Sequence, residues 1–107
     1  MADELVLKIE DILDSKKGKD IRKIDIRNKS TMADYFIIVS GTSTTHVKSL
    51  ADNLEEELKK LNVYPNKIEG YDSGSWILLD YDNIIIHIFT ESERENYSLE
   101  DLWEKIK

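Results

Sequence analysis

The chain has 107 residues and a net charge of −7, and 40% of its residues are hydrophobic. This length suits one domain, and the apolar content exceeds that of disordered chains, so we expect a single domain over residues 1–107. The acidic balance argues against direct binding of nucleic acid, because Lys and Arg supply most of the affinity for phosphate. It favours a basic protein surface as partner.

Cysteine is absent, which excludes disulfides and thiolate chemistry and is typical of a reducing compartment. No apolar run approaches the roughly 20 residues that a membrane-spanning helix needs. The N-terminal stretch MADELVLKIE is acidic and unlike a secretory signal. We therefore expect a cytoplasmic protein that does not associate with membranes.

The N-terminal part of the chain predicts one helix and two strands. Apolar residues at helical spacing, followed by two lysines and Gly18, predict a helix over residues 2–17. Alternating isoleucines after Asp20 predict a short strand. The unbroken apolar run in DYFIIVSG, residues 34–41, predicts a buried strand at the centre of a sheet.

The next stretch, TSTTHVKSLADNLEEELKKLN, predicts a second helix. Its apolar residues recur at intervals of three and four from Val47 to Leu61, and Ser43 or Thr44 can cap its start. Two pairs of opposite charge lie four residues apart on its solvent side: Glu55 with Lys59, and Glu56 with Lys60.

The last part predicts a small sheet region and a final helix. After Pro65 we expect a short strand at Lys67–Glu69, a turn from Gly70 to Gly74 and a hairpin. Ser98 with Asp101 resembles a capping box and predicts a helix over residues 99–106. These elements predict an α+β (α/β) fold with flanking helices and a mixed or mainly antiparallel sheet of about five strands.

A two-residue turn at Asp82 and Asn83 fixes the register of the hairpin, because both residues tolerate the positive φ that such turns need. Paired residues share a face of the sheet, and neighbours alternate between faces. One face is almost wholly apolar and belongs under the helices: Ile77, Leu79, Tyr81, Ile84, Ile86 and Ile88. The other face mixes aromatic, aliphatic and polar groups: Trp76, Leu78, Asp80, Ile85, His87 and Phe89.

The second face has the composition of a protein interface, where aromatic anchors accompany a few hydrogen-bonding groups. We predict that Trp76, Leu78, Asp80 and Tyr81 dock a partner. His87 is interpreted as a sheet histidine with satisfied nitrogens or as an interface contact. The alternative is that helices cover both faces and that all these residues belong to the core.

No motif predicts catalysis. Gly41-Thr42-Ser43 joins a strand to a helix, where backbone N–H groups can hold an anion, but such residues more often form only a tight turn and a helix cap. His46 and His87 are the only histidines, and neither has metal-ligand spacing. Asp80 and Asp82 resemble the carboxylate pair of a two-metal site, yet Asp82 is explained by the turn. We expect no enzyme, no metal and no cofactor.

Three stretches of the sequence, DYFIIVSGTSTTHVKSLADNLEEEL, EGYDSGSWILLDYDNIIIHIF and RENYSLEDLW, resemble the Iojap family, also called ribosomal silencing factors. The match runs in order from about Leu5 to Trp103. It implies a domain of nucleotidyltransferase-like topology that acts by binding. Such factors attach to large-ribosomal-subunit protein fourteen, block the joining of the two subunits and repress translation under nutrient limitation.

For this chain the resemblance implies that the face bearing Trp76 is the docking surface, extended by Gly70 and Asp72. Nucleotidyltransferases also carry an Asp-x-Asp or Asp-x-Glu pair after their glycine turn. Here Asp52-Asn53-Leu54 follows Gly41 by eleven residues, so the second carboxylate is missing.

Two alternatives stay open. One is a degenerate nucleotidyltransferase-type enzyme that binds nucleotide with Gly41, Thr42, Ser43 and Asp80 around a metal. The other is a homodimer of the free protein through the face bearing Trp76, because an exposed apolar patch tends to pair with itself.

Overall fold

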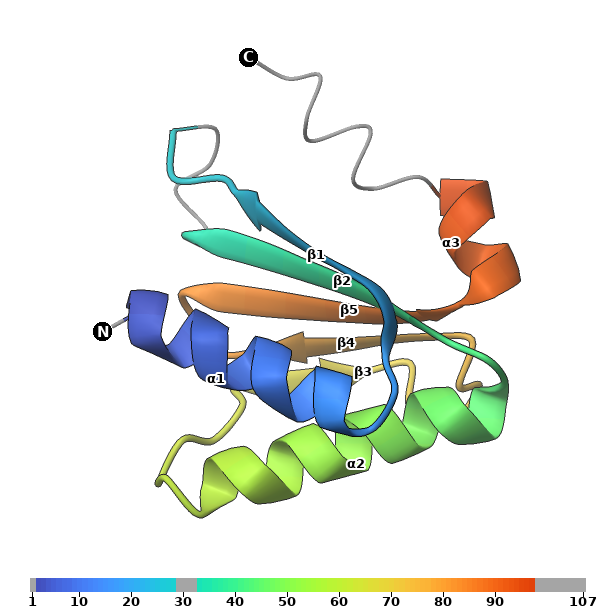
Figure 1. Cartoon of the computed structure of the whole chain (residues 1–107), viewed down its shortest axis with the longest axis horizontal. Coiled ribbons are helices and arrows are strands. Elements are labelled where there is room, and N and C mark those ends of the chain that lie inside the picture. The colour runs from blue at the N-terminus through green and yellow to red at the C-terminus, as the bar shows by residue number, and fades with distance from the viewer. Residues whose placement is uncertain (1, 29–32, 98–107) are drawn as a thin grey trace.

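The computed structural model describes residues 2–28 and 33–97, and the side chains of residues 4–28 and 33–95. The elements of this part are shown in Figure 1: α1 (Ala2–Ser15), β1 (Lys19–Asp25), β2 (Tyr35–Gly41), α2 (Thr44–Lys59), β3 (Lys67–Glu69), β4 (Trp76–Asp80), β5 (Ile84–Thr90) and α3 (Glu91–Tyr97). The strands form one sheet in the order β1-β2-β5-β4-β3, with β2 parallel to β5 and the other neighbours antiparallel. The predicted α+β fold with a mixed sheet is confirmed.

Helix α1 ends in a left-handed turn at Lys17, where φ is 65°. The Gly18 N–H donates to the Leu13 carbonyl at 2.9 Å, which satisfies a carbonyl at the end of the helix. The helix ends at Ser15, two residues before the predicted end at residue 17, and Lys17 rather than Gly18 carries the positive φ. Glycine is needed at position 18 because a Cβ there would lie 2.7 Å from a methyl group of Val39.

Helix α2 is capped by Ser43 as predicted, since the Ser43 hydroxyl accepts a hydrogen bond from the N–H three residues later. The predicted apolar stripe is buried at Val47, Leu50, Ala51, Leu54 and Leu58. Leu61 lies beyond the helix and is 50% exposed. Lys60 closes the helix, and its Nζ makes its direct contact with the Glu57 carboxylate at 3.0 Å, while the predicted partner Glu56 contributes its charge without a direct ion pair.

The β4–β5 hairpin has the predicted register, with Trp76 opposite Phe89 and Asp80 opposite Ile85. Of the two turn residues only Asp82 has a positive φ, 68°. The main core lies between this sheet and helices α1 and α2, which lie in front of the sheet in Figure 1. Its strand residues are Tyr35, Ile37, Val39, Ile77, Leu79, Tyr81, Ile84, Ile86 and Ile88.

Helix α3 follows β5 without a loop and was not predicted from the sequence. The Thr90 hydroxyl accepts a hydrogen bond from the Glu93 N–H at 3.4 Å and so caps the helix. Arg94 then ties the helix to the sheet, because its Nη1 donates to the Ser40 hydroxyl at 2.9 Å and to the Lys19 carbonyl at 3.3 Å. The predicted helix over 99–106 and its capping box lie outside the described residues.

Candidate protein-binding site on the sheet

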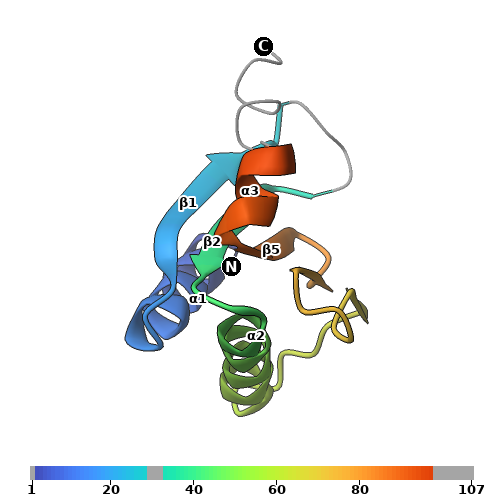
Figure 2. The same cartoon turned by 90° about the vertical axis from the view of Figure 1, so that its right-hand side faces the viewer.

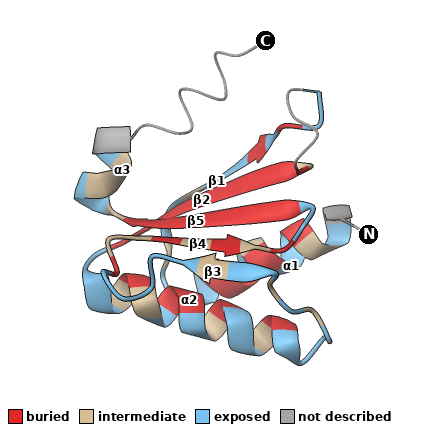
Figure 3. Ribbon diagram, turned by 180° about the vertical axis from the view of Figure 1, so that it is seen from behind, coloured by how far each residue is buried: buried red, intermediate tan, exposed pale blue. Residues whose placement is uncertain are grey.

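The face of the sheet turned away from α1 and α2 carries a second apolar cluster. It comprises Ile24, Ile26, Ala33, Phe36, Ile38, Ile85 and Phe89, with Trp76 and Leu78 packed against it. Figure 3 shows this face: β2 and β5 are buried, whereas β4 and β3 carry intermediate and exposed residues. Helix α3 packs against β2 and β5 and lies at one end of the sheet (Figure 2). The centre of this face is therefore core, and its β4–β3 edge is accessible.

The Trp76 indole is held in one pose by its neighbours. Its Nε1 donates a hydrogen bond to His87 Nδ1 at 3.1 Å. The same ring stacks on Phe89 with centroids 4.9 Å apart, and Phe36 meets the edge of His87 at 5.0 Å. Such aromatic contacts contribute beyond their buried area. Trp76 is only half-buried, so one part of a rigidly held indole remains accessible.

His87 supports the site from below rather than lining it, since it is only 5% exposed. Burial lowers the pKa of His87 to about 4, so the ring is neutral at neutral pH. Because Nδ1 accepts from Trp76, the single proton of the neutral ring is on Nε2, which is buried and has no hydrogen-bond partner in the described part of the chain. His87 therefore orients Trp76 and is not itself placed to touch a partner.

Beside the indole lies a small cavity of about 260 Å³, lined by Glu69, Gly70, Trp76 and Leu78. Gly70 has a φ of 80°, and a Cβ at this position would overlap the Trp76 carbonyl oxygen. Both features require glycine. Gly70 thus lets the loop before β4 pass directly over the backbone of Trp76, and it forms one wall of the cavity.

The remaining predicted site residues fall into three environments. Asp80 is half-buried on the same face as Trp76, and its Oδ1 accepts a hydrogen bond from the Asp82 N–H at 2.9 Å. Asp72 is exposed in the loop between β3 and β4. Tyr81 is 6% exposed in the main core on the opposite face, where burial and the charge of Glu55 raise its pKa to about 12. The structure therefore separates Tyr81 from the surface that was predicted to include it.

The loop that precedes Trp76 is anchored to helix α2. The Tyr71 hydroxyl donates to Asp52 Oδ2 at 2.9 Å, and Lys48 Nζ lies 5.6 Å from the centre of the Tyr71 ring. The hydrogen bond to Asp52 raises the pKa of Tyr71. Asp52, the carboxylate that follows the glycine turn in sequence, is thus used to hold a loop.

Three backbone N–H groups beside the Gly41 turn are used within the chain. The Thr42 N–H donates to His46 Nδ1 at 2.9 Å, and Ser43 accepts from the N–H of His46 with its hydroxyl and from the N–H of Val47 with its carbonyl. Gly41 also pairs with the last residue of β5, whereas Asp80 pairs with Ile85 near its first. About five residues of strand, roughly 17 Å, separate the two. The residues proposed for a nucleotide-binding enzyme therefore do not converge.

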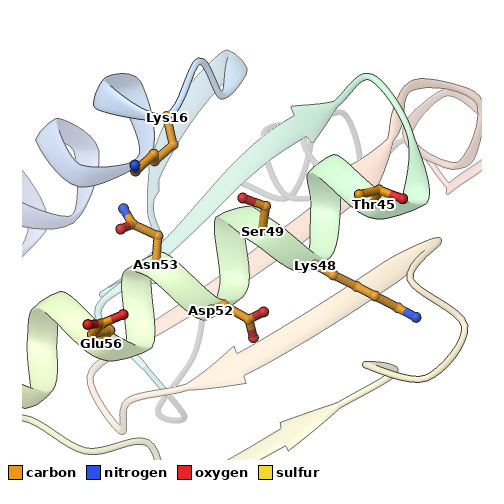
Figure 4. Close-up of a pocket in the computed structure, with 7 residues that line it drawn as sticks. All are labelled: Lys16, Thr45, Lys48, Ser49, Asp52, Asn53 and Glu56. Atoms are coloured by element: carbon orange, nitrogen blue, oxygen red, sulfur yellow. The ribbon is translucent and has the colours of Figure 1, made fainter.

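A polar groove of about 420 Å³ runs along α2 and reaches the end of α1 (Figure 4). Its lining combines two lysines, two carboxylates and three neutral polar residues: Lys16, Thr45, Lys48, Ser49, Asp52, Asn53 and Glu56. Figure 4 shows Asn53 turned toward Lys16, and Lys48 and Asp52 turned toward the other side. Among the described residues no group of three His, Cys, Asp or Glu side chains gathers to hold a metal. The groove has the makeup of a solvated helix face.

Sequence reasoning missed two residues of the site and one element beside it. Phe36 reaches His87 only because β2 runs parallel to β5, and nothing local in the sequence shows this pairing. Glu69, on the short edge strand, lines the cavity. Helix α3 did have a local signal, because Thr90 and Glu93 have the spacing of a capping box.

The described residues contain no helix long and apolar enough to cross a membrane. Residues 1–107 match the family model described as "Ribosomal silencing factor during starvation". The chain is 40% identical to the ribosomal silencing factor RsfS of Zymomonas mobilis, over 94% of this chain and 76% of that protein. It is 43% identical to RsfS of Haemophilus influenzae, over 85% and 89%.

The chain is also 35% identical to a mouse protein named "Mitochondrial assembly of ribosomal large subunit protein 1". The match covers 86% of this chain and 42% of the mouse protein. A crystal structure of a Chromobacterium violaceum protein superposes on this chain with a TM-score of 0.93 at 30% identity, covering 98% of this chain and 88% of that one. A Bacillus halodurans crystal structure gives 0.86 at 29% identity, covering 94% of each chain.

Proposed function

Because this chain belongs to the ribosomal silencing factor family, we propose that it binds the large ribosomal subunit through large-ribosomal-subunit protein fourteen. Bound there, it blocks the joining of the small subunit by occupying the contact face. Translation is then repressed under nutrient limitation. The protein acts in the cytoplasm, and it makes and breaks no covalent bond.

The observation that carries this proposal is the half-buried Trp76 beside an apolar cavity. A partner side chain that enters the cavity meets Trp76 and Leu78 on one side and Gly70 on the other. Interface hot spots are typically aromatic groups in such well-packed pockets. Asp80 lies on the same face of β4, and its half-buried carboxylate is suited to an Arg or Lys of a basic protein. Asp72 extends the surface along the loop.

Steric blocking requires area rather than chemistry. A specific interface buries roughly 800 Å² on each partner, and the accessible surface of this chain is 6277 Å². Docking through the accessible β4–β3 edge and its loop would leave α1 and α2 on the opposite face of the sheet, where they supply bulk between the two subunits.

The test is whether the purified protein co-sediments with isolated large subunits and lowers their association with added small subunits. We expect both effects to saturate at one copy per large subunit. Unchanged joining at saturating protein would contradict the proposal. If the free protein forms a homodimer through the same face, its apparent molecular mass in analytical ultracentrifugation would rise with concentration. Large subunits would then compete with the dimer for that face.

A further inference from the structure

The charges of this acidic protein are unevenly distributed. Residues 16–27 carry six of the fifteen Lys and Arg residues but only two of the twenty-two Asp and Glu residues. This segment therefore has a net charge of +4, and the rest of the chain has −11. The overall charge of −7, which argues against nucleic acid, conceals a strongly basic segment.

The fold places this basic segment along one margin of the molecule. It begins directly after α1 and contains the whole of β1, which is an edge strand bonded only to β2 in the described sheet. Five cations form what we call the basic strip: Lys17, Lys19, Arg22, Lys23 and Arg27, all of them exposed. Three strands, β2, β5 and β4, lie between this margin and β3, which borders the Trp76 cavity.

Local contacts position two side chains of the strip and pair one of them with a carboxylate. Lys23 Nζ and the Arg27 guanidinium lie 5.6 and 5.2 Å from the centre of the Tyr35 ring. Their stems thereby cover Tyr35, which is 5% exposed, and their charged ends stay in solvent. Arg27 also pairs with Asp25 at 2.6 Å, which neutralises one of the two carboxylates of the segment.

The start of the strand adds a cationic recess. A β-bulge interrupts the pairing between Lys19 and Arg22, and Asp20 takes a φ of 51° there. A shallow cleft of about 360 Å³ opens at this point, lined by Asp20, Ile21, Arg22 and Arg94. Two guanidinium groups thus border one cleft, next to the exposed lysines of the strip.

We propose that the basic strip binds RNA phosphates of the large ribosomal subunit beside the protein that the Trp76 surface contacts. A line of cations along an extended strand matches a polymer whose charges repeat along its backbone. The proteins of a ribosome are mostly basic themselves, so the polyanion within reach of a docked factor is RNA. This inference rests on the proposed function, because the Trp76 surface supplies the docking.

An ordinary explanation of the same lysines is protection of an edge strand. Lysine on an edge, together with a bulge, prevents two sheets from pairing edge to edge. That explanation predicts aggregation when the lysines are removed. It does not predict a change in the salt dependence of ribosome binding, so the two explanations can be separated.

The test compares the triple variant Lys17→Gln, Lys19→Gln, Lys23→Gln with a control, Lys8→Gln, Lys59→Gln, Lys60→Gln. Both lose three exposed lysines and reach the same net charge. Binding to isolated large subunits is measured at several salt concentrations. K is the association constant for the large subunit. We expect the strip variant to reduce the steepness of log K against log salt by about 2 to 3. Its affinity at low salt should fall by about 10- to 100-fold. The control keeps the wild-type slope.

A second arm measures binding to the separated large-subunit protein that the chain captures. We expect both triple variants to bind it as tightly as the wild type does. Equal slopes for the two variants on intact subunits would overturn the strip proposal alone. Equal losses on subunits and on the separated protein would overturn it as well, because the strip would then meet protein. A wild-type chain that binds no large subunit would overturn the proposed function together with it.

Discussion

On the face of the sheet beneath α1 and α2, the residues of β4 and β5 are apolar and fully buried, whereas on the opposite face Trp76, Leu78 and Asp80 of β4 are only half-buried. Leu78 and Leu79 are adjacent, yet they lie on different faces. The first face is completed by the chain's own helices. The second ends in an aromatic group and a cavity at the β4–β3 edge, so part of it is left for contact with another molecule.

The largest effect on stability is expected from the neighbouring leucines. Leu79→Ala opens a cavity in the main core and should lower the free energy of unfolding by about 3 to 4 kcal/mol. Leu78→Ala removes a half-buried side chain and should cost about 1 kcal/mol. Urea unfolding measures both. Equal losses would mean that the two faces are equally part of the core.

His87 makes stability on the second face depend on pH. Its pKa is about 4 in the folded protein and 6.5 ordinarily, so the unfolded chain binds the proton first as pH falls. Stability present above pH 6.5 is therefore lost between pH 6.5 and 4, by about 3 kcal/mol. His87→Gln keeps an acceptor for Trp76 and should remove this loss. Urea unfolding of both chains at several pH values should show the two curves diverging; parallel curves would refute the assignment.

Gly70→Ala tests the support of the cavity. The added methyl group overlaps the Trp76 carbonyl and takes a φ that alanine disfavours, so we expect a loss of about 2 kcal/mol and weaker binding to large subunits. Ser49→Ala on the exposed side of α2 is the control and should be close to neutral. Thermal unfolding and co-sedimentation measure the pair. A fully active Gly70→Ala protein would show that the loop does not position Trp76.

The smallest effect is expected at the edge of the sheet. Arg27 holds the pKa of Asp25 at about 2, so the pair stabilises the protein above pH 3.8 and this contribution fades as pH falls toward 2. Both side chains are about half exposed, and solvent screening limits the contribution to less than about 1 kcal/mol. Arg27→Gln should therefore change urea unfolding at neutral pH only slightly. A loss of several kcal/mol would indicate a structural role for the basic strip.

The hairpin was predictable because its information is local. A two-residue turn and a period of two fix which side chains share a face, and the register from Trp76 to Asp80 follows. Helix α2 was predictable for the same reason, from its stripe and its cap. The parallel pairing of β2 with β5 joins strands more than forty residues apart in sequence, so the contact of Phe36 with His87 was not predictable.

Two further features of the structure differ from the prediction made from the sequence. A single net charge hides the cations of β1 among the acidic helices. The docking prediction for Tyr81 conflicts with the alternation that already places it on the apolar face, and the structure buries it in the main core. Placing a residue in a docking surface therefore requires its face as well as its neighbourhood in sequence.

The central claim is that the half-buried part of the second face docks the large ribosomal subunit. The most direct test is the affinity of the double variant Trp76→Ala, Leu78→Ala for isolated large subunits, after urea unfolding has confirmed that it is folded. The account predicts a loss of about 100-fold, or roughly 3 kcal/mol, and a matching loss of the block on subunit joining. Wild-type affinity in a folded double variant would contradict it.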